Sequence, residues 1–511
     1  MSLLRALAAI SSLTFVSRVL GYARDFFIAR LFGASLATDA FFVAFKIPNL
    51  LRRLFAEGAF SQAFVPILAE QKNRNPSEVR DLIDGVATLL SIALVVAAAL
   101  GMAAAPLIVY VTAPGFAAEP GKFALTVELL RITFPYIVFI SLVSLAAGIL
   151  NTWNRFSIPA LTPALLNVSF IVGAVFFAEH FDPPVKVLAW AVFAGGVLQL
   201  ALQIPVLARL GLLPRWRLDW RHPGVRRILL LMAPAAFGVS VSQVSQLINQ
   251  VFASFLVTGS VSWLYYADRL MEFPAGMLGV AVGTILLPSL SRYHAGDARE
   301  EYSKLLDWGL RVTLVLALPA AAALAVLAIP LIASLFHYGR FSIEDAWMTR
   351  QALVAYSVGL VGMILVKILA PGFYARQNVV TPVKIGIVTL VATQAMNFAF
   401  VGPLKHAGLA LAIGLGACLN AGLLYRYLRA QGIFTPQAGW GAFAVKIFVA
   451  VVVMAAALHF AMGAPDWWLA AAWQAKLGAL VGLVVLGAAA YVACLFAMGF
   501  RLHQFSRAAA P

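Results

Sequence analysis

The sequence predicts an all-α polytopic membrane protein on the strength of its composition, its long apolar segments and the distribution of its Lys and Arg residues. Of 511 residues, 62% are hydrophobic and 11% are charged, and the mean hydropathy is +0.91. Soluble globular proteins carry about 45–50% apolar and about 25% charged residues. Too few charges are present to cover a soluble globule, and the apolar content excludes a disordered chain.

Membrane-spanning helices need about 20 consecutive, mostly apolar residues. Such segments predict about 14 spans. Those in the range 8–32, 36–60 and 262–290 are less apolar than the others. The predicted spans are 8–32, 36–60, 82–112, 125–150, 159–180, 185–208, 226–256, 262–290, 305–336, 346–373, 382–402, 406–428, 440–462 and 472–498.

Topology explains most of the formal net charge of +16, because Lys and Arg gather in cytoplasmic connections. With a cytoplasmic N-terminus, most Lys and Arg outside the helices fall on the cytoplasmic side. The opposite side holds Arg30, Lys122, Lys186, Arg340 and Lys405. We therefore expect both termini in the cytoplasm. The Trp- and Arg-rich segment 209–227 predicts an interfacial helix, and nucleic-acid binding there is the weaker alternative.

An internal repeat is suggested by three matches at offsets of 222–224 residues, each containing a proline. VPIL (65–68) matches LPSL (287–290), PLI (106–108) matches PLI (330–332), and NRFSIP matches RQNVVTP. The alternative is that proline is common at helix ends. A parallel repeat predicts two six-helix lobes related by an axis along the membrane normal. The expected organisation is an N-lobe (1–208), a linker (209–225), a C-lobe (226–430) and two further helices with a tail (431–511).

Ionisable residues inside predicted helices are the candidate functional groups, because one charge at a helix centre costs about 2.5–3.5 kcal/mol on the insertion scale. Spacing predicts that Arg53 lies next to Glu57, and Arg269 next to Glu272. Asp268 and Glu272 are also spaced by one turn. Further same-face pairs join Arg18 to Asp25 and Asp39 to Lys46.

Arginines outnumber the available carboxylates in these helices. Local pairing and snorkelling to the interface account well for Arg53 and Glu57. They account poorly for the four arginines Arg18, Arg24, Arg52 and Arg269. Such arginines around a cavity suit a polyanionic substrate, since the guanidinium fork matches phosphate oxygens. Pro48 and Pro274 should bend their helices and make room for that cavity.

Other chemistry is not indicated by the sequence. The two cysteines, Cys418 and Cys494, and the seven histidines show no metal-ligand spacing. No metal site and no cofactor are expected, and no nucleotide-binding motif is present. Transport would then be driven by the membrane potential, an ion gradient or the substrate gradient. The polar residues Gln243, Gln246, Asn249, Gln394, Asn397 and Asn420 could serve a cation site, although interhelical hydrogen bonding is the simpler interpretation.

Two stretches closely resemble the MurJ (MviN) family of lipid II flippases, of the multidrug/oligosaccharidyl-lipid/polysaccharide exporter superfamily. They are SRVLGYARDFFIARLFGASLATDAFFVAFKIPNLLRRLFAEGAFSQAFVPILAE (17–70) and YYADRLMEFPAGMLGVAVGTILLPSLS (265–291). The resemblance covers essentially the whole chain. It implies a transporter, not an enzyme, in the bacterial inner membrane. This transporter would move undecaprenyl-pyrophosphate-linked peptidoglycan precursor to the periplasmic leaflet by alternating access.

The resemblance also implies roles for individual residues. Family arginines match Arg18, Arg24, Arg52 and Arg269 as substrate-binding groups. Family acids match Asp25, Asp39, Glu57 and Glu272, and we assign them to salt bridges that form or break between conformational states. We add Arg53 and Asp268 to these residues as candidate gating groups. The last two helices would form a groove for the lipid tail. Some relatives bind sodium through an acid, but the seventh predicted helix has none, so the coupling ion stays unassigned. Lipid II and membrane lipid are the implied ligands, and cell-wall synthesis proteins stay open as partners.

Three alternatives predict different residues. The first is a related exporter, either of drugs or of another lipid-linked oligosaccharide. A drug-cation exporter would line its cavity with carboxylates and aromatic rings. A membrane enzyme acting on polyprenyl phosphates would need clustered acids or a catalytic histidine at the membrane edge. A structural scaffold would not need arginines at membrane depth.

Overall fold

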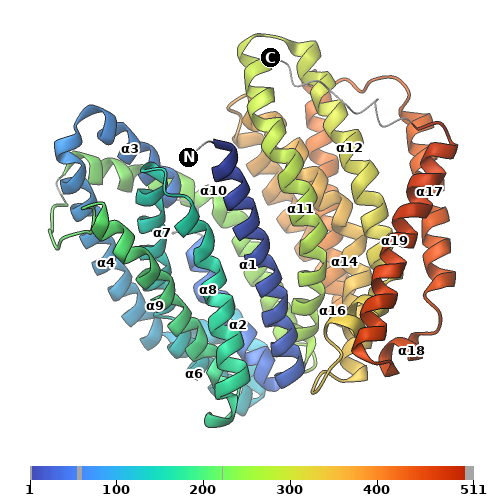
Figure 1. Cartoon of the computed structure of the whole chain (residues 1–511), viewed down its shortest axis with the longest axis horizontal. Coiled ribbons are helices and arrows are strands. Elements are labelled where there is room, and N and C mark those ends of the chain that lie inside the picture. Colours follow the sequence, from blue (N-terminus) through green and yellow to red (C-terminus); the bar gives the residue numbers. More distant parts are fainter. Residues whose placement is uncertain (1–2, 54–59, 221, 501–511) are drawn as a thin grey trace. The chain divides into compact units, whose positions relative to one another are not determined.

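The computed structural model describes residues 3–53, 60–220 and 222–500, which are helical apart from their connections. The chain divides into two compact units between Ser262 and Trp263, and each unit is described by itself (Figure 1). Within the described residues, nine helical stretches are long and apolar enough to cross a membrane. The molecule is therefore an all-α, multi-pass membrane protein, as the composition predicts.

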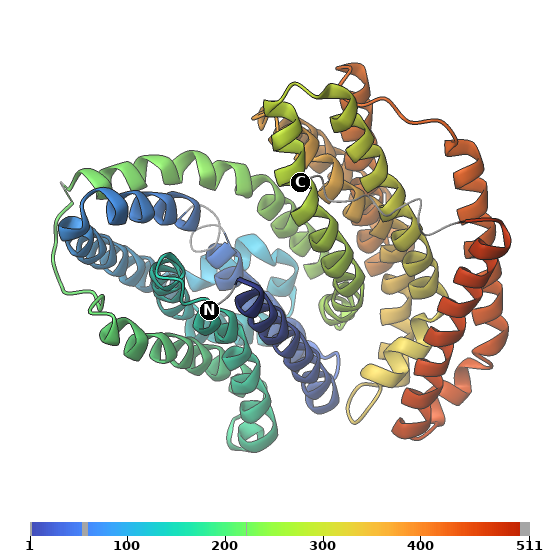
Figure 2. The same cartoon turned by 45° about the horizontal axis from the view of Figure 1, so that its top comes forward.

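The described residues of the first unit form ten α-helices. α1 packs along α8, α8 packs against α9, and α2 packs against α6 (Figure 1 and Figure 2). α10 contacts α3, α4 and α5. The bounds are α1 (Leu3–Phe32), α2 (Leu36–Leu51), α3 (Ser61–Arg74), α4 (Val79–Ala103), α5 (Ala105–Thr112), α6 (Pro120–Thr133), α7 (Tyr136–Thr152), α8 (Ser157–Val172), α9 (Lys186–Arg209) and α10 (Pro223–Ser254).

The second unit is built on the packing of α14 against α12 and α16. α17 and α19, connected through α18, form a pair that packs onto α12 and α13. The Tyr491 hydroxyl of α19 donates to the Val315 carbonyl of α12 at 2.8 Å. The bounds are α11 (Ser260–Ala295), α12 (Arg299–Val326), α13 (Ala328–Leu335), α14 (Ile343–Leu369), α15 (Pro371–Tyr374), α16 (Val380–Ala430), α17 (Trp440–Ala461), α18 (Pro465–Ala470) and α19 (Trp473–Ala497).

α16 is a helical hairpin formed by two predicted spans. Lys405 has φ 51° and ψ −129°, which interrupts the helix just after Pro403. Gly408 lies against the Phe400 carbonyl, and Gly416 lies against the Thr393 side chain. In each contact, the two residues are separated from Lys405 by similar numbers of residues along the chain, one before it and one after it. The two halves of α16 therefore run antiparallel. Separate predicted spans at 382–402 and 406–428 are consistent with this reversal.

Each of the 14 predicted spans overlaps at least one of these helices. The exact number of membrane crossings and the limits of the lobes and linker stay predictions. The compact units divide after Ser262, and α10, which was predicted to open the C-lobe, contacts helices of the first unit. Eight of the described helices lie outside the nine long apolar stretches: α1, α2, α3, α5, α10, α11, α13 and α18. Three of these correspond to the spans predicted to be less apolar.

The interfacial helix predicted at 209–227 is wrong for most of its length. α9 ends at Arg209, Gly211 has φ +69°, and residues 212–219 form no helix or strand. Asp84 and Thr88 on α4 hold this segment by accepting the backbone N–H groups of Arg215 and Arg217 at 2.8 and 2.9 Å. Gly211 and Pro214 are signals that stop a helix, and here they prevail over the amphipathic composition.

Large apolar side chains cover much of the outer surface. Phe460 is 84% exposed, Phe398 78% and Phe448 69%. So many exposed large apolar side chains on long apolar helices are unusual on soluble monomers. In a bilayer, the same side chains contact lipid tails.

Close packing of α14 on α16 gives the first testable expectation. A Cβ added at Gly359 would lie 2.0 Å from the Gly414 Cα, so replacing Gly359 by valine must separate the two helices. We expect the Gly359→Val protein to melt at a markedly lower temperature in detergent, because overpacking typically costs about 1–3 kcal/mol or more. Gly422 on α16 has no atom within 4 Å of such a Cβ, so Gly422→Val is the control. Equal melting temperatures for the two variants would contradict this packing.

Candidate functional site

A buried arginine–aspartate pair on α1 is the best-defined part of the candidate site. Arg24 is 7% exposed and Asp25 is fully buried. The Arg24 Nε and Nη2 atoms both donate to Asp25 Oδ1, at 2.9 and 2.7 Å. The long arginine side chain thus folds back onto its neighbour in sequence. The predicted pairing of Arg18 with Asp25 is replaced by this adjacent pair.

α8 completes the surroundings of Arg24. The Arg24 Nη1 atom donates to Asn167 Oδ1 at 3.1 Å, and the Asn167 amide donates to the Ser17 carbonyl at 3.0 Å. The guanidinium also lies 5.4 Å from the centre of the Phe170 ring. Asn167 therefore joins α8 to both the side chain and the backbone of α1. Sequence analysis missed Asn167, because an isolated asparagine in an apolar helix carries no spacing signal.

The other arginines of the first unit are more accessible. Arg18 is exposed and lies six residues before Arg24 on α1, about 9 Å along the helix axis. Arg52, next to the end of α2, is half-buried and donates from Nε to Asn49 Oδ1 at 2.9 Å. Arg53 is exposed. Glu57, its predicted partner, lies outside the described residues.

A second buried ion pair joins α2 to α6 and to the α10–α11 connection. Lys122 on α6 donates to Asp39 Oδ2 on α2 at 3.1 Å, and both side chains are 1% exposed. Lys122 also donates to Thr258 Oγ1 at 3.2 Å and lies over the Phe116 ring. The predicted ion pair between Asp39 and Lys46 is therefore wrong, because Asp39 pairs with Lys122. A partner from another helix cannot be found from spacing within one helix.

Asp39 also caps the first turn of α11. Its carboxylate accepts the backbone N–H groups of Gly259 and Ser262 at 2.7 and 2.9 Å, and the Ser262 hydroxyl at 2.7 Å. A carboxylate at a helix N-terminus satisfies unpaired N–H groups and is favoured by the helix dipole. Asp39 thus fixes the connection that leads into α11 to the start of α2.

Within the second unit, the remaining predicted site residues, Asp268, Arg269 and Glu272, lie on α11. Arg269 Nη1 donates to Glu272 Oε2 at 2.8 Å, which confirms the pair predicted by the spacing. Both side chains are partly exposed, at 29% and 54%, so the pair is accessible to a competing anion. Asp268 is also exposed. Lys367 of α14 donates to the Ala275 carbonyl at 3.0 Å, and its chain packs against Gly279.

The charged groups do not form a metal centre within the part of the chain that the structure describes. No group of three or more His, Cys, Asp or Glu residues there could hold a metal ion. The described site consists of guanidinium and ammonium groups with carboxylates and amides around them. Groups of this kind can bind an anion reversibly where it displaces an internal carboxylate.

Solved structures show the fold to which this arrangement belongs. The chain is similar to a structure described as lipid II flippase MurJ in an inward closed conformation, with a TM-score of 0.79, 26% identity, and coverage of 95% of this chain and 99% of that one. It also resembles an inward-facing multidrug resistance MATE family transporter of the MOP superfamily, with a TM-score of 0.66, 17% identity and coverage of 83% and 98%. The fold and the buried charges define a multi-pass membrane transporter.

Sequence comparisons give the family. The family model described as lipid II flippase MurJ matches residues 28–472. Lipid II flippase MurJ of Burkholderia cenocepacia is 52% identical over 100% of both chains. The probable lipid II flippase MurJ of Vibrio cholerae is 41% identical over 99% of this chain and 98% of its own. The chain belongs to the MurJ family of lipid II flippases, which are transporters and not enzymes.

Proposed function

We propose that this protein translocates lipid II from the cytoplasmic to the periplasmic leaflet of the bacterial inner membrane by alternating access. The substrate is an undecaprenyl-pyrophosphate-linked peptidoglycan precursor. Family membership over the full chain and the relatives' names support this assignment. The bias of Lys and Arg toward one set of connections supports an orientation with both termini in the cytoplasm.

The observation that carries the proposal is the Arg24–Asp25 pair. A pyrophosphate cannot enter hydrocarbon uncompensated, because burying an unpaired charge is very costly. An arginine held in a buried site offers several N–H donors to phosphate oxygens. In the structure, two of the donor atoms of Arg24 bond to Asp25. Substrate would bind by displacing Asp25, and release would follow when Asp25 returns.

The remaining charged residues extend this exchange mechanism. Arg18, Arg52 and Arg269 would supplement Arg24 as substrate-binding groups, and each is at least partly accessible. Glu272 holds Arg269 at 2.8 Å and would compete with substrate as Asp25 does. Asp39, Arg53, Glu57 and Asp268 would act in gating. Asp39 has the clearest structural basis for that role, because it joins α2 to the first turn of α11.

We further propose that an ion gradient or the membrane potential drives transport. A head group with a double phosphate carries negative charge, so moving it across the membrane couples directly to the potential, at about 2.3 kcal/mol per charge per 100 mV. No coupling ion is assigned to particular residues.

Asn167 is expected to position Arg24. Replacing Asn167 by alanine removes one hydrogen bond to the guanidinium and one to the α1 backbone. A net hydrogen bond is worth about 0.5–1.5 kcal/mol, so translocation should fall by roughly two- to tenfold while the protein still folds. The measurement is the translocation rate of purified protein in vesicles. Asn151 on α7 is exposed, and Asn151→Ala is the control. Equal rates for the two variants would show that Arg24 does not depend on Asn167.

The function itself is tested in cells depleted of their own lipid II flippase and supplied with this chain. A leaflet-accessibility assay should show normal periplasmic exposure of lipid II, and an empty vector should show its loss. Membrane insertion of the protein is verified in the same cells. Correct insertion without restored exposure would contradict the proposed substrate or direction.

A further inference from the structure

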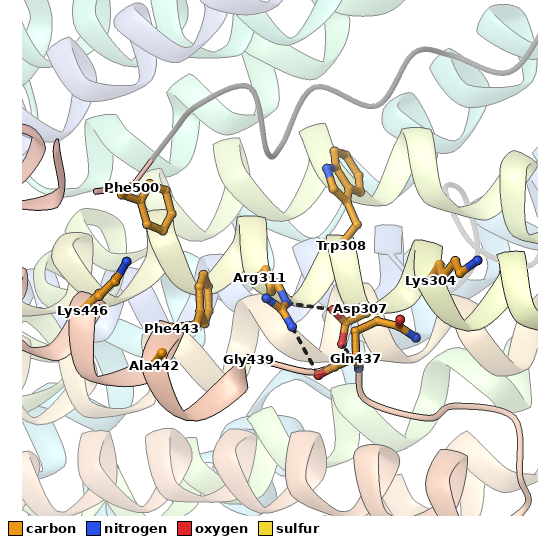
Figure 3. Close-up of a pocket in the computed structure, with 10 residues that line it drawn as sticks. All are labelled: Lys304, Asp307, Trp308, Arg311, Gln437, Gly439, Ala442, Phe443, Lys446 and Phe500. Carbon is orange, nitrogen blue, oxygen red and sulfur yellow. Dashed lines mark hydrogen bonds and ion pairs between the residues drawn. The ribbon is translucent and has the colours of Figure 1, made fainter. Parts of the chain in front are cut away.

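A cavity of about 370 Å³ lies in the second unit between residues 304–311 of α12, the first turns of α17 and the connection before α17 (Figure 3). Three cations, Lys304, Arg311 and Lys446, line it together with one acid, Asp307. The residues assigned to the lipid II head group all lie on α1, α2 and α11 or next to them, so this cavity is separate from the head-group site. Its volume falls in the range of small-ligand pockets, roughly 300–1,000 Å³.

The acid in this cavity is fully engaged by the protein. Asp307 is 3% exposed and accepts from Arg311 Nε at 2.7 Å, the Gln437 backbone at 3.0 Å and Trp440 Nε1 at 2.7 Å. The donors from Gln437 and Trp440 fix Asp307 to the connection before α17 and to the first residue of that helix. Asp307 is therefore a structural anchor, and a bound anion would not have to displace it.

Arg311 retains donor capacity after its structural contacts are made. Besides Asp307, it donates from Nη2 to the carbonyls of Gln437 and Ala438 at 3.3 and 2.9 Å. The guanidinium also stacks near the rings of Trp440 and Phe443. Its Nη1 atom donates to none of the described residues. The guanidinium is thus held rigidly with one edge open, as anion recognition requires.

Lys446 is the second cation that a ligand could contact. It is the single Asp, Glu, Lys or Arg in the sequence of α17, it is half-buried, and it makes no hydrogen bond or ion pair with any described residue. Lys304 differs, because Glu300 and Glu301 hold it at 2.6 and 3.1 Å. Arg311 and Lys446 are therefore the groups available to a ligand.

The depth of the cavity matches the lipid head groups. Both α12 and α17 are candidate membrane spans, and the cavity lies near the start of each. Lys446 is six residues after Trp440, the first residue of α17, or about 9 Å along the axis. The head-group region is about 5–8 Å thick on each side of the hydrocarbon core, and a lysine side chain can reach back toward it.

The walls of the cavity favour a lipid over a free anion. Trp308, Phe443 and Phe500 line it beside the cations, so part of its wall is apolar and suits the glycerol and acyl regions of a lipid. Val445 and Phe448, which flank Lys446 on α17, are 62% and 69% exposed and offer a surface for an acyl chain. Basic pockets between membrane helices are typical sites for anionic head groups.

We propose that this cavity binds the phosphate of an anionic phospholipid, with Arg311 and Lys446 as its ligands. The aromatic rings contact the glycerol region, and the outer face of α17 contacts an acyl chain. On the proposed topology, the bound lipid belongs to the cytoplasmic leaflet. This site does not depend on which cargo the transporter carries.

The test is native mass spectrometry of the full-length protein in detergent, titrated with phosphatidylglycerol or with phosphatidylcholine of the same acyl chains. The wild-type protein should retain phosphatidylglycerol preferentially. Lys446→Gln should lower its occupancy by about fivefold, the value of one cation near a charged head group. Lys446→Arg should retain binding. The control Lys384→Gln alters an exposed lysine of α16 and should bind like the wild type.

Two outcomes would overturn the proposal. The first is equal retention of the two lipids, or undiminished phosphatidylglycerol binding by a Lys446→Gln protein that melts at the wild-type temperature. The second is displacement of the lipid by millimolar inorganic phosphate, which would identify a free-anion site. If millimolar glycerophosphoglycerol and inorganic phosphate both fail to compete, the acyl chains contribute to binding as proposed.

Discussion

Replacing Arg24 by alanine is expected to abolish lipid II translocation. The change removes the guanidinium that would hold the pyrophosphate and leaves the buried Asp25 without its partner. A charge-assisted hydrogen bond contributes about 1.5–3 kcal/mol, so losing even one of several should reduce the rate by roughly ten- to a hundredfold. The measurement is the periplasmic accessibility of lipid II in depleted cells that express the variant.

Loss of folding must be separated from loss of function in this variant. Breaking a buried ion pair on one side costs about 3–5 kcal/mol, because the remaining charge is uncompensated. The double variant Arg24→Ala/Asp25→Ala removes both charges and should restore the melting temperature without restoring translocation. Arg30 is exposed on the same helix, and Arg30→Ala serves as the control. Normal translocation by the double variant would remove Arg24 from the substrate site.

The second large effect is expected at the Asp39–Lys122 pair, and it concerns stability. Asp39→Ala leaves Lys122 buried at 1% exposure and removes the cap from the first turn of α11. We expect the free energy of unfolding to fall by about 3–5 kcal/mol, which thermal unfolding in detergent would show as a large decrease in melting temperature.

A matched exposed pair provides the comparison for Asp39. Asp81 on α4 pairs with Arg217, and both side chains are roughly half exposed. Exposed pairs contribute about 0–1 kcal/mol, so Asp81→Ala should melt close to the wild type. The double variant Asp39→Ala/Lys122→Met should recover part of the lost stability. Similar melting temperatures for Asp39→Ala and Asp81→Ala would show that the buried network does not hold the fold together.

The sequence predicted the helices well because their signal is local. A long apolar run shows where a spanning helix can lie, and each predicted range overlaps a helix. The Arg269–Glu272 contact was also predictable, because residues three apart face each other on a helix. The reversal at Lys405 was predictable because Pro403 and Lys405 separate two apolar runs, each long enough for its own span.

The ion pairs of the first unit were harder to predict because their geometry is not set by spacing along one helix. Arg24 bonds to its immediate neighbour Asp25, which helix spacing would place on a different face. Lys122 was counted among the few cations in the connections on the non-cytoplasmic side. In the structure it is buried against Asp39. The sequence analysis predicted a helix in the linker because of its Trp and Arg content, but residues 212–219 are not helical. Its backbone donors are satisfied by Asp84 and Thr88 instead.

Translocation of lipid II by the purified protein in vesicles tests the central claim most directly. Vesicles with the wild-type chain, under an imposed membrane potential, should expose inner-leaflet lipid II to an external reagent much faster than empty vesicles. Vesicles with Arg24→Ala/Asp25→Ala should behave like empty ones. The account would be contradicted if the wild-type chain gave no acceleration at either sign of the potential, or if the double variant matched its rate.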